Sequence, residues 1–148
     1  MSSIRIVIVE DEQLAAIALA RLVRKLEPEA DILAMLSSVK QAVEWFSTHT
    51  ADLVLMDIEL GDGQAFRIFE KVPIHAPVIF TTAYDQYAIK AFKANGIDYL
   101  LKPVDETELK AALEKYRQWL LRAPDYQALM DYFATGTPRK EYKQRFMV

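Results

Sequence analysis

The sequence predicts an α/β fold in which helices cover both faces of a parallel β-sheet. Short apolar runs alternate along the chain with stretches of helical periodicity, which is typical of repeated β-α units. The apolar runs are continuous rather than interrupted by polar residues, as expected of strands that are buried on both faces. Because 52% of the 148 residues are hydrophobic, the chain can bury one sizeable core, and we predict one domain with a short extension.

Five segments have the composition of buried strands, and four of them end at polar residues. The predicted strands are residues 4–9, 30–36, 53–56, 78–80 and 99–101. The polar residues at the ends of four of these strands are Glu10 with Asp11, Asp57, Thr82 and Lys102. Since parallel sheets bind ligands at the carboxyl ends of their strands, we expect these side chains to meet at one edge of the sheet.

The first three helices are predicted from apolar spacing, caps and helix breakers. A helix over residues 11–27 ends before Pro28, which cannot continue it. A second helix follows a cap at Ser37 or Ser38 and continues to Phe46. A flexible turn at residues 61–63 precedes a third helix, which ends before Pro73.

Two further helices and an extension complete the chain. A fourth helix covers residues 85–95 and ends where Gly96 provides a C-terminal stop. Asp105 and Glu108 have the spacing of a capping box, so we predict a fifth helix from residue 105 to about 121. After Pro124, a separate helical stretch at residues 125–133 is followed by a linker-like run.

Composition excludes several kinds of site. The chain has no cysteine, so disulfides and thiolate metal sites are not available to it. A secretory leader pattern and an apolar run near the roughly 20 residues that span a bilayer are both missing, so we expect a soluble, cytoplasmic protein without membrane contact. A net charge of −3 argues against a broad basic surface for nucleic acid on the domain itself.

The polar strand ends predict metal-assisted phosphoryl chemistry. Carboxylates at Glu10, Asp11 and Asp57 repel one another unless a cation lies between them. Oxygen ligands favour Mg²⁺, or alternatively Mn²⁺. Asp57 can then act as a nucleophile toward phosphorus, while Lys102 and the Thr82 hydroxyl stabilise the phosphoryl oxygens. These residues predict a phosphoacceptor site.

Four motifs, VIVEDE, LVLMDIELGDG, IFTTAYDQYAIKAF and GIDYLLKP, resemble the receiver domain of two-component response regulators over about residues 4–121. The resemblance implies a flavodoxin-like, doubly wound five-stranded sheet of order 2-1-3-4-5. It also implies phosphorylation of Asp57 by a histidine kinase. The domain would assist its own phosphorylation and dephosphorylation rather than act as an enzyme. Glu10 and Asp11 match the acidic pair of this family.

Further site residues are assigned through this resemblance alone. The backbone carbonyl of Glu59 would complete the metal shell together with Glu10, Asp11 and Asp57. Thr82 would be the switch hydroxyl and Tyr99 the switch aromatic residue. Pro103 would follow a cis peptide bond. Many receivers have Met-Pro after the phosphoacceptor segment, whereas this chain has Glu59-Leu60-Gly61, so we expect a differently shaped loop after Asp57.

The motifs are most similar to receivers joined to LytTR-type DNA-binding domains of the LytR/AlgR family. We therefore expect residues 1–122 to form the receiver, and residues 123–148 to form a helical extension and linker leading to a DNA-binding domain outside this chain. Phosphorylation would promote a homodimer through the fourth helix, the fifth strand and the fifth helix. Contact with DNA would require the additional domain.

Two other functions use similar residues. An aspartate-nucleophile phosphatase also combines Asp, Thr, Lys and Mg²⁺, although its nucleophile belongs to a D-x-D motif after the first strand rather than the third. A pseudo-receiver would act only as a protein-binding module. The acidic pair, Thr82 and Lys102 argue against the pseudo-receiver, and the position of Asp57 after the third strand argues against the phosphatase.

Overall fold

The computed structural model describes residues 3–84 and 96–135, and within them side chains as far as Leu121. Two compact units divide the chain, Met1–Leu113 and Glu114–Val148. The first unit contains the whole β-sheet, and the second contains the larger part of the last helix. The helix predicted at residues 85–95 and the linker after residue 135 lie outside the described residues.

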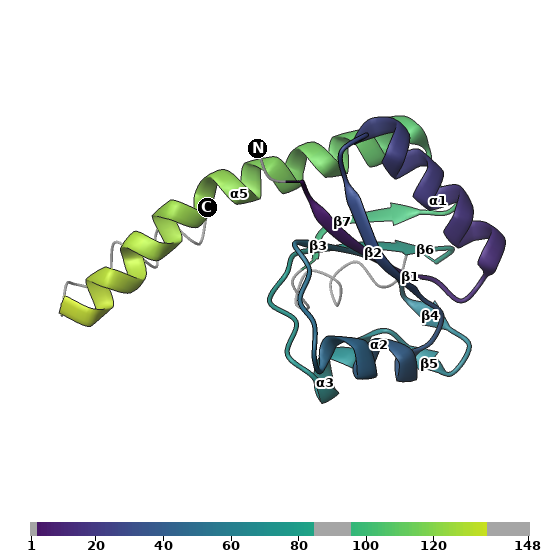
Figure 1. Cartoon of the computed structure of the whole chain (residues 1–148), viewed down its shortest axis with the longest axis horizontal. Coiled ribbons are helices and arrows are strands. Elements are labelled where there is room, and N and C mark those ends of the chain that lie inside the picture. The colour runs from purple at the N-terminus through teal and green to yellow at the C-terminus, as the bar shows by residue number, and fades with distance from the viewer. Residues whose placement is uncertain (1–2, 85–95, 136–148) are drawn as a thin grey trace. The chain divides into compact units, whose positions relative to one another are not determined.

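Five parallel strands form the main sheet in the order β2-β1-β3-β6-β7 (Figure 1). Their bounds are β1 (Arg5–Val9), β2 (Asp31–Leu36), β3 (Leu53–Asp57), β6 (Val78–Thr82) and β7 (Gly96–Leu101). The predicted order 2-1-3-4-5 is therefore confirmed, with β6 and β7 as the fourth and fifth strands of the prediction. Asp57 pairs in register with Thr81, and Thr82 with Leu101, so neighbouring strands end at the same level.

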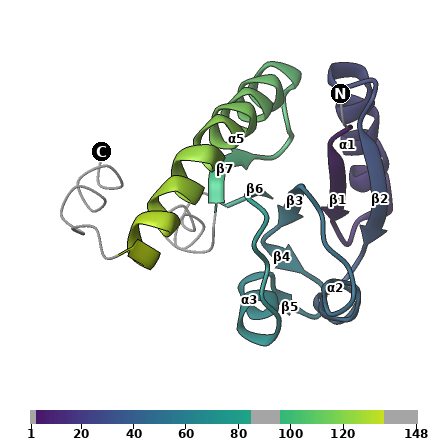
Figure 2. The same ribbon diagram turned by 60° about the vertical axis from the view of Figure 1, so that its left-hand side comes forward.

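Helices lie on both faces of this sheet (Figures 1 and 2). Helix α1 (Gln13–Leu26) and the first turns of α5 (Glu106–Thr135) cover one face, while α2 (Val39–Phe46) and α3 (Phe66–Lys71) cover the other. The Lys25 Nζ lies 2.9 Å from Glu106 Oε1 and links α1 to the start of α5. The Ser38 Oγ accepts a hydrogen bond from the Gln41 N–H at 3.0 Å, which confirms a serine cap on α2.

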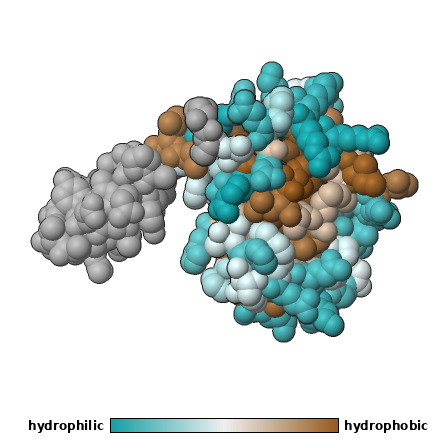
Figure 3. All heavy atoms as spheres, viewed as in Figure 1, coloured by the Kyte–Doolittle hydropathy of each residue, from teal (hydrophilic) through white to brown (hydrophobic). Residues whose placement is uncertain are grey.

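Burial explains why the central strands consist of continuous apolar runs. All residues of β1 after Arg5, and all residues of β3 and β6, are buried. Strand β2 is different because it lies at the edge of the sheet, where its exposure alternates. Leu33 and Met35 remain 36% and 42% exposed, and Figure 3 shows an apolar area on the face where β2 lies.

A short antiparallel hairpin follows β3 where the sequence predicted only a flexible turn. Strand β4 (Glu59–Leu60) pairs with β5 (Gly63–Gln64). Gly63, the first residue of β5, has a backbone φ of 141°, a region that residues with a Cβ rarely adopt. Leu60 is buried in the core and fixes one side of the hairpin.

The last helix is longer than predicted. A helix ending near residue 121 and a separate stretch at 125–133 were expected, but α5 runs continuously from Glu106 to Thr135. Proline removes one backbone donor and disturbs the preceding turn without always ending a helix, and Pro124 is accommodated within α5. Among the helices of residues 3–84 and 96–135, none is long and apolar enough to cross a membrane.

Candidate phosphoacceptor site

The polar residues predicted at the strand ends lie at one edge of the sheet. Glu10 and Asp11 follow β1, Asp57 ends β3, Thr82 ends β6, and Lys102 follows β7. Parallel pairing places the carboxyl ends of these four strands side by side, because each strand joins its neighbour in the same direction. The sheet therefore brings together residues that are separated by up to 92 positions in the sequence.

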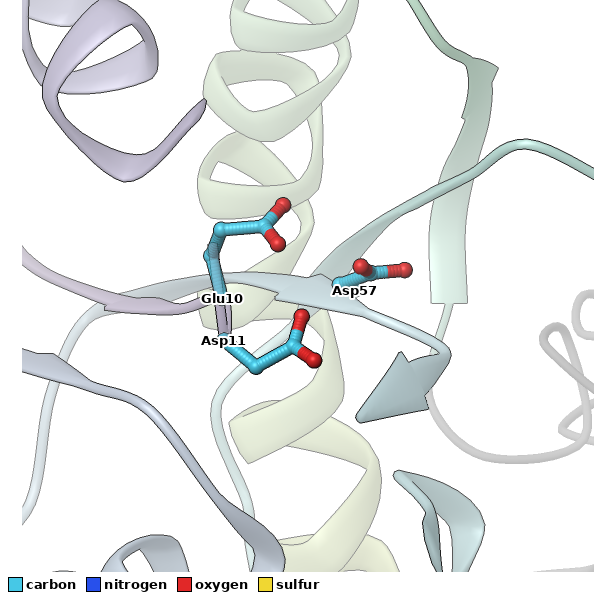
Figure 4. Close-up of side chains that lie close together, drawn as sticks. All are labelled: Glu10, Asp11 and Asp57. Carbon is cyan, nitrogen blue, oxygen red and sulfur yellow. The ribbon is translucent and has the colours of Figure 1, made fainter. Parts of the chain in front are cut away.

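Three carboxylates form the centre of the site (Figure 4). One carboxylate oxygen from each of Glu10, Asp11 and Asp57 lies within 4.8 Å of the others. Glu10 and Asp57 are only 4% and 5% exposed, whereas Asp11 is open to solvent. Partial desolvation by the surrounding atoms, together with the neighbouring Glu10 carboxylate, raises the pKa of Asp11 above its usual value. This cluster would be stabilised by a bound cation.

Lys102 neutralises part of this negative charge. Its Nζ lies 2.5 Å from Glu10 Oε1 and 2.8 Å from Asp57 Oδ2. Burial lowers the pKa of Lys102, but its hydrogen bonds and charge interactions with Asp57 and Glu10 outweigh that effect, so the pKa is raised. The ammonium group therefore stays protonated at neutral pH and remains in contact with the predicted nucleophile.

The composition of the cluster suits a hard divalent cation. Carboxylate oxygens are the ligands that Mg²⁺ and Mn²⁺ prefer, and Asp11 presents its carboxylate to solvent, where a hydrated ion can reach it. The Glu59 N–H donates to Asp57 Oδ1 at 3.2 Å, so the backbone of Glu59 lies beside the cluster. Its side chain accepts a hydrogen bond from Gln64 Nε2 within the hairpin. The residues present therefore fit the predicted ion.

Thr82 and Tyr99 are connected through the backbone of Tyr84. The Thr82 side chain is fully buried, and its Oγ1 accepts a hydrogen bond from the Tyr84 N–H at 3.3 Å. The Tyr99 hydroxyl donates to the Tyr84 carbonyl oxygen. A movement of the Thr82 hydroxyl would therefore disturb a segment that Tyr99 also contacts.

The backbone around Lys102 places its side chain at the end of the sheet. The Lys102 N–H donates to the Thr82 carbonyl oxygen at 2.7 Å, which extends the pairing of β6 and β7 by one residue. The following Lys102–Pro103 peptide bond is cis, the form that the resemblance implied.

Two residues beside the site were missed by the sequence analysis. Asp62, at the tip of the hairpin, accepts hydrogen bonds from the backbone of α2. A Cβ at Gly61 would lie 3.6 Å from Asp11 Oδ2, so the hairpin backbone closely approaches the cluster. The sequence signal was the Gly61-Asp62-Gly63 turn, but the sequence does not indicate the hydrogen-bond partners of Asp62, because the first two residues of α2 lie 23 and 22 positions earlier in the chain.

Comparison with known proteins supports the resemblance to two-component regulators. A sequence model described as "Response regulator receiver domain" matches residues 6–114. The chain is 35% identical over 118 residues to "Sensory transduction protein LytT" of Bacillus anthracis, covering 78% of this chain and 48% of that protein. It is 36% identical over 149 residues to "Uncharacterized response regulatory protein VC_A0850" of Vibrio cholerae, covering 93% and 56%. The chain thus spans about half the length of these relatives.

Solved structures show the same fold. The receiver domain of the Erythrobacter litoralis PhyR response regulator superposes with a TM-score of 0.67 at 28% identity, covering 78% of this chain and 91% of that chain. The response regulatory domain of Klebsiella pneumoniae mrkE superposes with a TM-score of 0.67 at 25% identity, covering 77% and 95%. Both likenesses cover more than three quarters of this chain.

Proposed function

Because the chain belongs to the response regulator receiver domain family, we propose that it accepts a phosphoryl group on Asp57 from a phosphohistidine of a histidine kinase. The observation that carries this proposal is the position of Asp57. Its buried carboxylate lies 2.8 Å from the Lys102 ammonium group and beside the acidic pair that can hold a metal ion. Phosphorylation of a receiver domain uses all these groups together.

The residues of the chain divide the work of phosphoryl transfer. An Asp57 carboxylate oxygen attacks phosphorus, the bond from phosphorus to the histidine nitrogen breaks, and an acyl phosphate forms. Lys102 stabilises the phosphoryl oxygens, since its ammonium group already contacts Asp57 Oδ2 and its raised pKa keeps it charged. Thr82, buried at the end of the adjacent strand, supplies a hydroxyl for another of these oxygens.

A divalent ion is part of this proposal. Glu10, Asp11, Asp57 and the backbone carbonyl of Glu59 would hold Mg²⁺, with Mn²⁺ as a substitute. The ion would supply positive charge that draws the phosphodonor to Asp57 and offsets the repulsion between phosphate and carboxylates. Glu10 is already bound by Lys102, and its longer side chain suits a contact through water. Asp11 is therefore the ligand on which binding depends most.

Phosphorylation of Asp57 is proposed to act on transcription in two steps, a change in the surface used for dimerisation and the response of a second domain. Phosphorylation would draw Thr82 toward the phosphoryl group and release Tyr99, promoting a homodimer through the segment at 85–95, β7 and α5. Relatives of which the matched region covers about half include "Transcriptional regulatory protein BtsR" of Salmonella typhi, 33% identical over 117 residues, which are 48% of that protein. We therefore propose that a LytTR-type DNA-binding domain provides the output in a longer form of this protein.

Labelling with acetyl phosphate, a small-molecule phosphodonor, tests the central step. The parent protein should gain one phosphoryl group in the presence of Mg²⁺, read by mass spectrometry of the intact protein. Asp57→Asn should gain none, because the nucleophile is lost. Asp52→Asn is the matched control, since Asp52 precedes the same strand at its opposite end and pairs with Arg5. Labelling of Asp57→Asn, or labelling that persists after chelation, would contradict the assignment.

The labelling experiment and a turnover assay with phosphate esters together separate the alternatives. A pseudo-receiver would remain unlabelled under all conditions, and a phosphatase would release phosphate from ordinary ester substrates with repeated turnover. We expect the protein to hold the phosphoryl group and then lose it once, without turnover of a separate substrate.

A further inference from the structure

The β4–β5 hairpin touches the carboxylate cluster at two points. It begins two residues after Asp57, whose Oδ1 accepts the Glu59 N–H at 3.2 Å. At the far end of β4, Gly61 approaches Asp11, and a Cβ added to Gly61 would lie 3.6 Å from Asp11 Oδ2. Both the predicted metal-binding carbonyl and the backbone beside Asp11 therefore belong to this one short element.

The hairpin is a short element. Only two residue pairs form it, and isolated two-stranded hairpins are marginally stable. Burial of Leu60 secures its first strand. At the return strand, Gly63 lies close to Arg67, with 3.3 Å from an added Cβ to Arg67 Cδ. The tip, at Asp62, has a separate attachment.

Asp62 joins the hairpin tip to the beginning of α2. Its Oδ1 accepts the Val39 N–H at 2.8 Å, and its Oδ2 accepts the Lys40 N–H at 3.1 Å. These are the first two residues of α2, whose amides have no partner within the helix. The Val39 hydrogen bond is the main cause that lowers the pKa of Asp62, so the carboxylate is ionised and both oxygens accept at neutral pH.

We propose that Asp62 is a positioning residue for the metal site. By binding the amides of α2, its carboxylate fixes the hairpin and holds the Glu59 backbone and Gly61 in place beside Asp57 and Asp11. Asp62 does not touch the ion in this proposal and acts only through the hairpin. The inference rests on the proposed function, because it concerns the Mg²⁺ that assists phosphorylation of Asp57.

Mg²⁺ affinity measured by isothermal titration calorimetry tests this role. Loss of a group that orients metal ligands typically weakens metal binding by about 10-fold or more, and we expect a loss near that lower value for Asp62→Ala. Asp52→Ala is the matched control, because Asp52 also accepts a backbone N–H, from Arg5 at 2.8 Å, but lies at the opposite end of β3. It should bind Mg²⁺ as the parent protein does.

Two comparisons distinguish position from charge. Asp62→Asn loses the negative charge but keeps an oxygen that can accept one amide, so it should retain clearly more affinity than Asp62→Ala. Val39→Pro keeps the Asp62 charge but removes the amide that donates to it. Ser38 has an extended backbone and α2 begins at Val39, which is where proline is tolerated best. Val39→Pro should therefore bind Mg²⁺ more weakly than Val39→Ala, which keeps the amide.

The rate of labelling by acetyl phosphate gives a second readout. Asp62→Ala should need more Mg²⁺ to reach half of its maximal rate, while the maximal rate at saturating Mg²⁺ stays close to that of the parent, because the nucleophile and Lys102 are intact. Circular dichroism establishes that each variant is folded. If Asp62→Ala does not fold, the comparison of Val39→Pro with Val39→Ala tests the proposal in its place.

The outcomes separate this inference from the proposed function. Equal Mg²⁺ affinity in the parent and Asp62→Ala would overturn the positioning role alone. Equal losses in Asp62→Asn and Asp62→Ala, with no difference between the Val39 variants, would show that Asp62 acts by its charge and would also overturn it. A parent protein that neither binds Mg²⁺ nor becomes labelled would instead contradict the proposed function, and the inference with it.

Discussion

The Nζ of Lys102 lies 2.8 Å from Oδ2 of Asp57, although 45 residues separate them in the sequence. This contact holds a positive charge beside the predicted nucleophile before any phosphodonor arrives. Among the residues that the structure describes, Lys102 is the one cation that contacts both buried carboxylates of the cluster, those of Glu10 and Asp57. The relationship between these two residues leads to the first of four predictions.

Replacement of Lys102 should separate phosphorylation from metal binding. Lys102→Ala removes a charged donor from the phosphoryl oxygens, and removal of one such donor typically slows a reaction by about 100-fold or more. Mg²⁺ affinity should stay the same or rise, because a competing cation is lost from the cluster. Initial rates of acetyl phosphate labelling and calorimetric Mg²⁺ titration measure the two effects.

Lys25→Ala is the control for this prediction. Lys25 also pairs with a carboxylate, at 2.9 Å from Glu106, but it lies on α1 away from the strand ends. Its rate should equal that of the parent protein. A Lys102→Ala variant that is labelled at the parental rate would show that the ammonium group has no role in phosphoryl transfer.

Asp11 should reduce stability when no metal is bound. Its pKa in the folded state is raised above the ordinary value of 3.8, so the folded protein binds this proton more tightly than the unfolded chain does. The resulting contribution to stability is complete below the unfolded pKa and is lost as pH rises through the folded pKa. At pH 7 in EDTA, Asp11→Asn should therefore be more stable than the parent. The gain should be at most about 1 kcal/mol, because Asp11 is exposed and solvent weakens its repulsion with Glu10.

Urea unfolding at several pH values checks this sign. The advantage of Asp11→Asn should shrink as pH falls toward 3.8, the ordinary value for the group. Addition of Mg²⁺ should stabilise the parent but not the variant, since binding to the folded state alone contributes about 2.7 kcal/mol at 100 times the dissociation constant. A variant that is less stable than the parent at pH 7 in EDTA is the contrary result.

The hydroxyl of Thr82 should be needed for output as well as for stabilising the phosphoryl oxygens. With Mg²⁺ and beryllofluoride, which mimics a phosphoryl group, the parent should shift toward a dimer in sedimentation velocity. Thr82→Val keeps the buried volume but lacks the hydroxyl, so it should stay monomeric under the same conditions, while Thr82→Ser should respond. Thr81→Val is the control, because successive strand residues point to opposite faces. A full dimer shift in Thr82→Val would remove the switch role.

Sequence-selective DNA binding should require more chain than these residues. Residues 138–148 contain four basic residues and one acidic residue. Such a segment is attracted only weakly to the phosphates of DNA, and salt screens this attraction. Base recognition needs an ordered element in a groove. Fluorescence anisotropy at physiological salt should show no preference among DNA sequences for residues 1–148 and a clear preference for a longer form. Selective binding by residues 1–148 alone would contradict the proposed output domain.

Local sequence determined the elements and the residue types of the site. Continuous apolar runs predicted β1, β3 and β6 because both faces of these strands are covered, and Asp57 was identified because it ends such a run. The strand order and the acidic pair were predicted through the family resemblance and the rule that parallel sheets bind ligands at their carboxyl ends. The helix stop near Pro124 was wrong, because a local rule for proline does not decide whether a helix continues.

Only the tertiary structure decided which groups contact one another and at what distance. Lys102 contacts both Glu10 and Asp57 because the ends of β1, β3 and β7 are aligned in the sheet. That alignment depends on residues that are distant from one another in the sequence. The attachment of Asp62 to the start of α2 likewise depends on how a hairpin and a helix on the same face are packed. Sequence patterns report the periodicity of each segment, whereas a hydrogen bond of about 3 Å between segments depends on the packing of the whole sheet and its helices.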